Sequence, residues 1–323
     1  MADGFGNVAA DVPLRGDDRT LPLPDFALMH RVGSVPSAEA YLELGRSLAL
    51  GLRSALPPEW TFEGKNVLDF GSGAGRVLRH FLEPAAQAQS FVAADPDKRS
   101  IDWLREHLIP PFQAVQSGEL PPLPFPDDTF DLVYGLSVFT HLPDSWWQWL
   151  HELHRISRPG AYVLLTYQGR QAFRNWFDGA YDPDDVGIVG VHDGVPWDLG
   201  GAVVFHSERW IRAVWSSVFE IEGIVPGREG GAHDLAVLRT RRRPARSLED
   251  GPPTLPAGDE LRSLRLNLCL VRDEIRLLRH GPDSAELPIG GHGAEGHDAG
   301  PVSRTRDRAQ RLLRRLLLRR TGR

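Results

Sequence analysis

The sequence predicts an α/β protein built on a doubly wound, mostly parallel sheet. Short apolar runs alternate with segments of helical periodicity, and this alternation is typical of βαβ units. The runs are continuously apolar, as expected for strands that helices cover on both faces. The 323 residues are 41% hydrophobic and 25% charged, which is ordinary for a globular protein with a sizeable core.

Each element follows from its local pattern. Strands are predicted at the apolar runs, over 66–70, 90–94, 130–134, 161–166, 219–225 and 233–239. Helices are predicted where apolar residues recur at steps of three and four, over 37–56, 76–82, 99–108, 145–156 and 207–217. Residues 1–24 form a polar, flexible lead-in, and the Gly- and aromatic-rich segment 168–205 is expected to be a lid-like insertion without a crossover helix. The main domain is therefore predicted over 25–240.

A C-terminal helical extension is predicted after the linker 241–257. Within 258–280, apolar residues recur at heptad steps, at Leu261, Leu264, Leu268, Val271, Ile275 and Leu278. This coiled-coil seam, 261–278, is expected to pair in a homodimer or to dock on the main domain. Residues 281–323 form a Gly/His-rich spacer and an Arg-rich basic tail, which is expected to be disordered or to touch a membrane surface or an acidic partner.

The composition excludes several classes of protein. The net charge of −6 argues against specific nucleic-acid binding. The single Cys269 excludes a disulfide framework and a cysteine-based zinc site, and no metal is expected. Because no run of about eighteen apolar residues occurs and the first residues do not resemble a signal peptide, the expected compartment is the cytoplasm. The scarcity of lysine is typical of a GC-rich, bacterial genome.

The stretch VLDFGSGAGR at 67–76 carries the strongest functional signal. It places Gly71, Gly73 and Gly75 on a turn from a strand to a helix, where glycine allows a positive φ and a close approach by a ligand. The spacing Gly-x-Gly-x-x-Gly of dinucleotide-binding turns is broken, because an arginine holds the last position. Asp69 ends the strand, where its carboxylate would repel a pyrophosphate but suits an ammonium group such as that of S-adenosylmethionine.

A second carboxylate ends the next strand. Asp95 closes the run FVAAD at 91–95, twenty residues after Gly75. At this point of an α/β sheet an acidic side chain accepts hydrogen bonds from the two hydroxyls of a ribose. A turn or helix-cap role is the alternative for Asp95, and the neighbouring glycine loop favours ribose binding.

Four stretches together resemble the class I S-adenosylmethionine-dependent methyltransferases. VLDFGSGAGRVLRHF looks like the first motif of that family, and Asp95 matches its ribose-binding acid. LPFPDDTFDLV at 123–133, SVFTHL at 137–142 and LHRISRPG at 153–160 are similar to its later motifs. The resemblance covers about residues 60–170. It implies a seven-stranded sheet of the class I methyltransferase type, S-adenosyl-L-methionine as cofactor and S-adenosyl-L-homocysteine as product.

The resemblance also implies which residues bind the cofactor. They come from the glycine loop, the next strand end, the adenine side and the loop after the fourth strand: Asp69, Gly71, Ser72, Gly73, Gly75, Asp95, Glu119, Leu120, Leu136 and Ser137. Glu119 or Leu120 is expected near the adenine, where the family usually has Asp or Asn and the present sequence departs from that pattern. Asp131, by contrast, is interpreted as a local structural residue.

Histidines are the candidate bases for the acceptor. An alcohol acceptor needs a base within hydrogen-bond reach. His141 is the leading candidate, because it follows the fourth strand at the sheet edge where ligands bind in this architecture. His192 and His206, in or beside the insertion, are alternatives, and each of the three could instead have a structural role. Aromatic residues of the insertion, Trp176 and Trp197 among them, could wall an acceptor pocket or pack within a lid.

These observations predict an S-adenosylmethionine-dependent methyltransferase that acts on a small-molecule or sugar/glycan acceptor, at an oxygen atom. An NAD-dependent oxidoreductase is one alternative, against which Asp69 and Arg76 argue. A non-catalytic, cofactor-binding adaptor that works through the C-terminal helix is the other.

Overall fold

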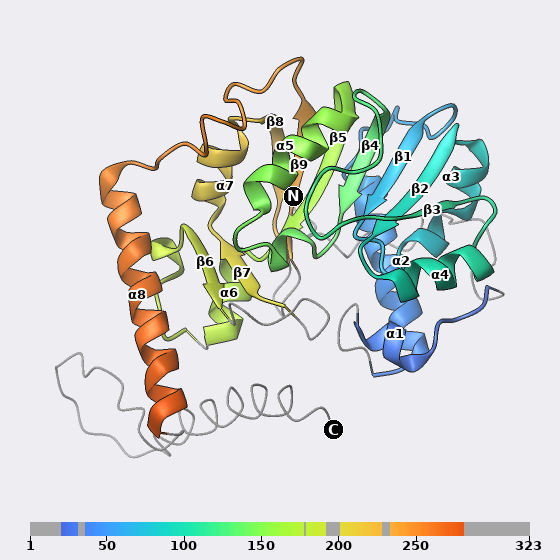
Figure 1. The fold of residues 1–323 in the computed structure, drawn as a ribbon. Helices are drawn as coiled ribbons and strands as arrows, with labels where there is room; N and C mark the ends of the chain where they lie inside the picture. The colour runs from blue at the N-terminus through green and yellow to red at the C-terminus, as the bar shows by residue number, and fades with distance from the viewer. Residues whose placement is uncertain (1–20, 32–35, 178, 192–200, 228–232, 281–323) are drawn as a thin grey trace. The chain divides into compact units, whose positions relative to one another are not determined.

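The protein is described here by a computed structural model, which describes residues 21–31, 36–177, 179–191, 201–227 and 233–280. The chain divides into two compact units, Met1–Glu260 and Leu261–Arg323. The first unit holds a central sheet with helices on both faces (Figure 1). The predicted doubly wound α/β architecture is therefore confirmed.

The central sheet has seven strands in the order β3-β2-β1-β4-β5-β9-β8. They are β1 (Asn66–Phe70), β2 (Ser90–Asp95), β3 (Gln113–Gln116), β4 (Phe130–Gly135), β5 (Ser157–Tyr167), β8 (Phe219–Val225) and β9 (Asp234–Thr240). All neighbours pair in parallel except β9, which is antiparallel to both β5 and β8. The sheet is thus mostly parallel, and the carboxyl ends of β1, β2 and β4 meet at one edge, where ligands bind in such sheets.

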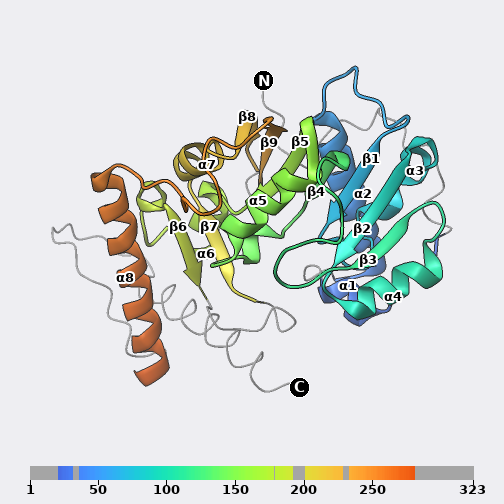
Figure 2. The same ribbon diagram turned by 45° about the horizontal axis from the view of Figure 1, so that its top comes forward.

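Two hydrophobic layers hold the helices on the sheet. The helices of the first unit are α1 (Phe26–Arg31), α2 (Ala38–Ser54), α3 (Leu82–Gln87), α4 (Lys98–His107), α5 (Trp146–Ile156), α6 (Arg170–Phe177) and α7 (Glu208–Trp215). Apolar residues of α5 and α7 pack on one face of the sheet, and those of α2 and α4 pack on the other. Alternate residues of a strand serve the two layers: Leu68 belongs to the first and Val67 to the second. Figure 2 shows the helices on either side of the sheet.

Two local predictions were wrong. The segment 76–82 does not form one regular helix: the glycine loop leads into a 3₁₀ turn, Leu78–Phe81, and α3 begins only at Leu82. The tight loop before it explains this, since the positive φ angles of its glycines cannot belong to a right-handed helix. The short strand β3, with the sequence QAVQ, was missed because it has no apolar run.

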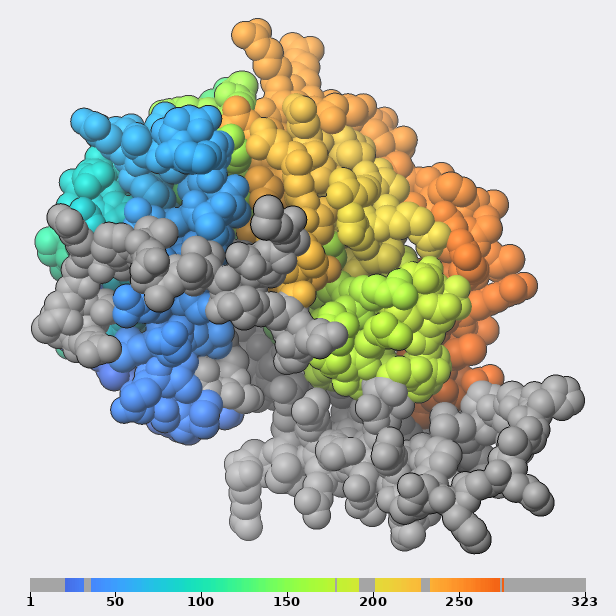
Figure 3. Space-filling model, turned by 180° about the vertical axis from the view of Figure 1, so that it is seen from behind, coloured from blue at the N-terminus to red at the C-terminus, as the bar shows by residue number. Residues whose placement is uncertain are grey.

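The insertion has a fold of its own. It contains α6, the 3₁₀ turn Pro183–Asp185 and a hairpin of β6 (Ile188–Val191) and β7 (Val203–His206). Phe173 and Phe177 of α6 are buried against Phe205 of β7, with ring centroids 5.4 and 5.8 Å away. These aromatic side chains form the core of the insertion rather than the wall of a pocket. Figure 3 shows the yellow-green lobe that α6 and β6 form.

The predicted heptad helix is present as α8, Ala257–His280. Leu261, Leu264, Leu268, Val271 and Ile275 of its seam are 42–70% exposed, and the side chain of Leu278 lies outside the described residues. Residues 241–257, before α8, belong to the first unit, where the Trp147 indole N–H donates to the Leu248 carbonyl at 3.2 Å. In the part of the chain that the structure describes, no helix is long and apolar enough to cross a membrane. The Arg-rich tail lies outside the described residues.

Candidate functional site

The glycine loop follows β1 at the carboxyl edge of the sheet. Gly71, Gly73 and Gly75 have φ angles of +77°, +52° and +77°, a conformation that side chains with a Cβ rarely adopt. A Cβ on Gly71 would lie 2.3 Å from Val138 Cγ2, in the loop after β4. The N–H groups of Gly71 and Ser72 both donate to the Ala94 carbonyl, at 2.8 and 3.2 Å. The loop is therefore fixed between the ends of β2 and β4.

Asp95 connects this loop to β2. Its Oδ2 accepts a hydrogen bond from the Gly73 N–H at 2.7 Å, and its Oδ1 accepts one from the Asp97 N–H at 2.8 Å. Burial raises the pKa of Asp95, while these two backbone bonds act to lower it. A carboxylate oxygen has two lone pairs, so each oxygen can accept a further bond from a ribose hydroxyl.

Asp69 is buried at the end of β1, where it pairs in the sheet register with Tyr134 of β4. Burial, the largest cause, raises the pKa of Asp69 to about 8, and the nearby Asp95 charge also acts to raise the pKa. The Tyr134 hydroxyl and the Arg76 charge act in the opposite direction and lower the pKa of Asp69. Asp69 Oδ2 has no hydrogen-bond partner among the described residues. A buried carboxylate with an unused oxygen has the chemistry to bind an ammonium group.

These features fit S-adenosylmethionine. The glycine loop bends sharply at positive φ angles after β1, Asp69 offers an oxygen to the ammonium group, and Asp95 lies at the end of the neighbouring strand for the ribose. The two carboxylates lie at adjacent strand ends, as Phe70 pairs with Ala94 in the register. The structure thus brings together the glycine loop, Asp69 and Asp95 as the sequence predicted.

The predicted adenine side lies at the same edge. Gln116, the last residue of β3, pairs with Asp95, and Glu119 and Leu120 follow in the next loop. Leu120 is 62% exposed. Glu119 and Leu120 therefore follow a strand whose end lies beside Asp95.

The loop after β4 faces the glycine loop. Leu136 packs on the core and Ser137 has a φ of +61°, with its N–H donating to Thr166 Oγ1 at 2.7 Å. His141 ends the short 3₁₀ turn that follows, and its Nδ1 lies 2.7 Å from the Ala202 carbonyl oxygen. Because a carbonyl oxygen only accepts, Nδ1 carries the proton and Nε2 of the neutral ring carries the lone pair. His141 thus connects the cofactor edge to the hairpin of the insertion.

The other two candidate histidines stand apart. His206 is 1% exposed, and its ring packs on Trp210 and Trp215, with centroids 5.1 and 6.2 Å away. Burial lowers the pKa of His206 to about 3, and neither ring nitrogen has a hydrogen-bond partner among the described residues. This environment is that of a core side chain. His192 lies outside the described residues, as does Trp197.

Asp131 has the structural role that the sequence indicated. Its Oδ2 accepts bonds from the Asn66 N–H at 2.9 Å and from the Arg158 guanidinium at 2.7 Å. Both contacts lie at the amino-terminal edge of β1 and β4, away from the glycine loop.

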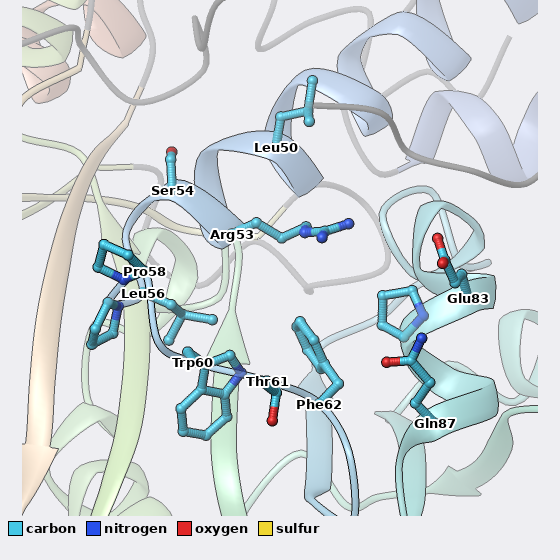
Figure 4. A pocket seen from close by; sticks show the side chains of 12 residues that line it. Leu50, Arg53, Ser54, Leu56, Pro58, Trp60, Thr61, Phe62, Glu83 and Gln87 are labelled. Carbon is cyan, nitrogen blue, oxygen red and sulfur yellow. The ribbon is translucent and has the colours of Figure 1, made fainter. Parts of the chain in front are cut away.

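A cavity of about 720 Å³ lies at that same far edge. Figure 4 shows Arg53 from the end of α2 above Trp60 and Phe62, which precede β1. Since the glycine loop follows the other end of β1, this cavity is separate from the cofactor site.

The fold and the two carboxylates define a class I S-adenosylmethionine-dependent methyltransferase. Comparison with known families agrees: the family described as "Methyltransferase domain" matches residues 35–220, and the chain belongs to this family. Among the residues that the structure describes, no group of three or more His, Cys, Asp or Glu could hold a metal ion.

Individual relatives are more distant. The chain is 31% identical over 104 residues to an uncharacterized methyltransferase of Mycobacterium leprae, covering 32% of this chain and 37% of that protein. It is 34% identical over 105 residues to a fatty-acid O-methyltransferase of Mycolicibacterium smegmatis, covering 32% and 37%. These matches span less than half of the relatives' length. A solved S-adenosylmethionine-dependent methyltransferase from Mesorhizobium loti is 15% identical, covers 60% of this chain and 97% of its own, and has a TM-score of 0.43.

Sequence reasoning did not single out Tyr134, whose hydroxyl lowers the pKa of the neighbouring Asp69. The signal that could have found it is position, because Tyr134 lies near the carboxyl end of a predicted strand, beside the glycine loop.

Proposed function

We propose that this methyltransferase transfers the methyl group to a hydroxyl oxygen of a small-molecule or sugar/glycan acceptor. The observation that carries the proposal is His141, at the cofactor edge with Nδ1 bonded to the Ala202 carbonyl. Two relatives support an oxygen acceptor by name, the fatty-acid O-methyltransferase and a probable tocopherol O-methyltransferase of rice, which is 28% identical over 115 residues.

In this proposal, separate residues bind the cofactor, accept the proton and exclude water. Bound S-adenosylmethionine supplies a methyl group on a positively charged sulfur. Asp69 binds the ammonium group and Asp95 the ribose, which together orient the ligand toward the loop after β4. His141 accepts the proton of the acceptor hydroxyl at Nε2. The lid hairpin, which His141 contacts through Ala202, excludes water from the edge.

A two-stage experiment tests this function. Calorimetry with S-adenosylmethionine, S-adenosylhomocysteine and NAD measures binding, and turnover is then followed as S-adenosylhomocysteine formed on a panel of fatty acids, phenols and sugars. Mass spectrometry of the product locates the methyl group. Binding of NAD alone would favour the oxidoreductase, and tight cofactor binding without turnover on any acceptor would favour the adaptor. Methylation of nitrogen or carbon would refute the hydroxyl acceptor.

We also propose that a second copy of the chain covers the seam of α8 in a homodimer. The support is the heptad spacing of five exposed apolar side chains, at Leu261, Leu264, Leu268, Val271 and Ile275. Exposed apolar residues at this spacing are the usual contact surface of a coiled coil.

Two further proposals rest on the sequence alone. The basic tail, 302–323, holds nine arginines and one acid and is proposed to contact an anionic membrane surface or an acidic partner. Sedimentation with anionic vesicles, compared for the full chain and a chain that ends at residue 301, tests this contact. The proposed compartment is the cytoplasm.

A further inference from the structure

A histidine outside the assigned site lies at the same edge of the sheet. His233 immediately precedes β9, and the first residue of that strand, Asp234, pairs with Tyr167, the last residue of β5. Because β9 is antiparallel to β5, its start lies beside the carboxyl ends of β5 and β4. The topology therefore places His233 at the edge that holds the glycine loop and His141.

The chain next to His233 is firmly held. Asp234 Oδ1 accepts a bond from the Gly227 N–H at 2.6 Å, which connects the ends of β8 and β9. Gly169 packs so closely on Asp234 that an added Cβ would lie 1.9 Å from its Oδ2. Asp234 thus has a structural role, and its contacts fix the backbone from which the half-buried His233 side chain extends.

Two residues from other loops, Arg76 and His141, act electrostatically on His233. Burial is the main cause that lowers the pKa of His233 to about 4, and repulsion from protonated His141 and from Arg76 lowers it further. Arg76 follows the glycine loop, and His141 ends the turn after β4. The imidazole of His233 is therefore neutral at pH 7 and can donate one hydrogen bond and accept another.

We propose that His233 is an acceptor-binding residue that holds the acceptor hydroxyl beside His141. The inference rests on the proposed function. In the transfer, a lone pair of the hydroxyl oxygen forms the new O–C bond, the electron pair of the broken C–S bond stays on sulfur, and the proton passes to His141 Nε2. His233 makes a hydrogen bond to the same oxygen and so directs its lone pair toward the methyl carbon.

Steady-state kinetics of full-length variants test this role, with an acceptor from the panel described above. His233→Ala is expected to raise the acceptor KM by about tenfold, the effect of losing one hydrogen bond, while calorimetric affinity for S-adenosylhomocysteine stays within about twofold. His233→Gln, which keeps a donor and an acceptor, is expected to restore most of the loss. The control is His107→Gln, on the outer side of α4, where the ring bonds the Trp103 carbonyl of its own helix.

Wild-type KM and kcat in His233→Ala would overturn the inference. Loss of S-adenosylhomocysteine binding in that variant would also overturn it, because it would show a role in the cofactor site or in folding. Absence of turnover in the wild-type protein instead contradicts the proposed function, so the two failures are distinguishable.

A measurement that needs no turnover checks whether His233 and His141 lie next to each other. NMR titration of the histidine rings, with S-adenosylhomocysteine bound, should show His233 titrating well below the usual range and His141→Ala raising its pKa. An unchanged His233 titration in His141→Ala would mean that the two rings do not face each other, and the inference would fail.

Discussion

The Gly73 N–H donates a hydrogen bond of 2.7 Å to Asp95 Oδ2, so the carboxylate proposed to bind the ribose also fixes the glycine loop. The other oxygen of this carboxylate holds the Asp97 N–H, and Asp97 in turn caps α4 through a bond from the Arg99 N–H. One side chain thus couples the loop after β1 to the loop after β2. Any substitution of Asp95 acts on the shape of the site as well as on the ribose.

This double role of Asp95 predicts that affinity for S-adenosylmethionine falls by different amounts in different Asp95 variants. Asp95→Ala should weaken S-adenosylmethionine binding by about 2 kcal/mol, roughly thirtyfold, because charge-assisted bonds to the ribose are lost. Asp95→Asn keeps one oxygen acceptor and should lose less. Calorimetry gives both affinities, and Asp127→Asn, an exposed acid near Arg155, serves as control. Equal wild-type affinity in both Asp95 variants would contradict the assignment of the ribose site.

The raised pKa of Asp69 predicts that cofactor binding releases a proton from its carboxyl group. Its pKa of about 8, raised by burial, means that the carboxyl is mostly protonated at pH 7 in the free protein. Pairing with the cofactor ammonium group favours the charged form, so binding should release up to about one proton and should tighten from pH 6 to pH 8. Calorimetry in buffers of different ionisation enthalpy measures the release. A proton release that persists unchanged in Asp69→Asn would assign it to another group.

The same pKa predicts an effect on stability without cofactor. The folded-state pKa lies above the unfolded value of 3.8, so the folded protein holds the proton more tightly. This contribution is complete below about pH 4 and is lost as the pH rises toward 8. Asp69→Asn should therefore raise the Tm at pH 8 and leave it nearly unchanged at pH 4. A lower Tm at pH 8 would show that the ionised carboxylate is stabilised in the fold.

Substitution of His141 should lower the rate of methyl transfer without a comparable loss of cofactor affinity. If its Nε2 accepts the acceptor proton, His141→Ala lowers kcat by about 10² to 10⁴ while cofactor affinity stays within a few-fold. His141→Gln, which can still donate to the Ala202 carbonyl, keeps the link to the hairpin but offers no base. A kcat restored to the wild-type value in His141→Gln would make His141 a structural residue.

His206 should behave as a core residue. Burial lowers its folded-state pKa to about 3, so its contribution to stability is present above the unfolded value of 6.5 and is lost as the pH falls toward 3. His206→Phe should flatten the loss of stability between pH 6 and pH 4, and kcat should stay within a few-fold of wild type. A large fall in kcat with an unchanged Tm would instead return His206 to the candidate bases.

Sequence patterns predicted the sheet and the glycine loop at its edge because both depend on local signals. The runs at β1, β2 and β4 are apolar on both faces, and the glycines of the loop have positive φ angles that the local sequence requires. The strand-end position of Asp95 is also a local signal, and family resemblance added the loop after β4. These features need no knowledge of distant contacts.

Positions that depend on long-range contacts could not be predicted in the same way. His233 reaches the cofactor edge because β9 inserts between β5 and β8, which is a long-range pairing. Phe173 and Phe205 meet because the insertion folds on itself, so their aromatic character alone did not distinguish a lid core from a pocket wall. Likewise, the burial of His206 under Trp210 follows from packing and has no signature in its neighbours along the chain.

The last prediction concerns the seam of α8. Leu268 is 70% exposed, and burying such a side chain fully is worth about 1.5 to 3 kcal/mol, so five of them at heptad spacing provide a sufficient contact for a second copy. Leu268→Asp in the full chain should lower the mass in light scattering from that of a dimer to that of a monomer, because a carboxylate cannot be buried in the seam without a partner.

The control variant is Arg265→Gln, which lies on the same helix outside the seam. It changes the net charge by the same amount as Leu268→Asp and should leave the mass unchanged. Since the described cofactor residues all lie before residue 240, affinity for S-adenosylmethionine should be the same in both variants. A monomeric wild-type protein, or an unchanged dimer in Leu268→Asp, would show that the seam does not mediate self-association.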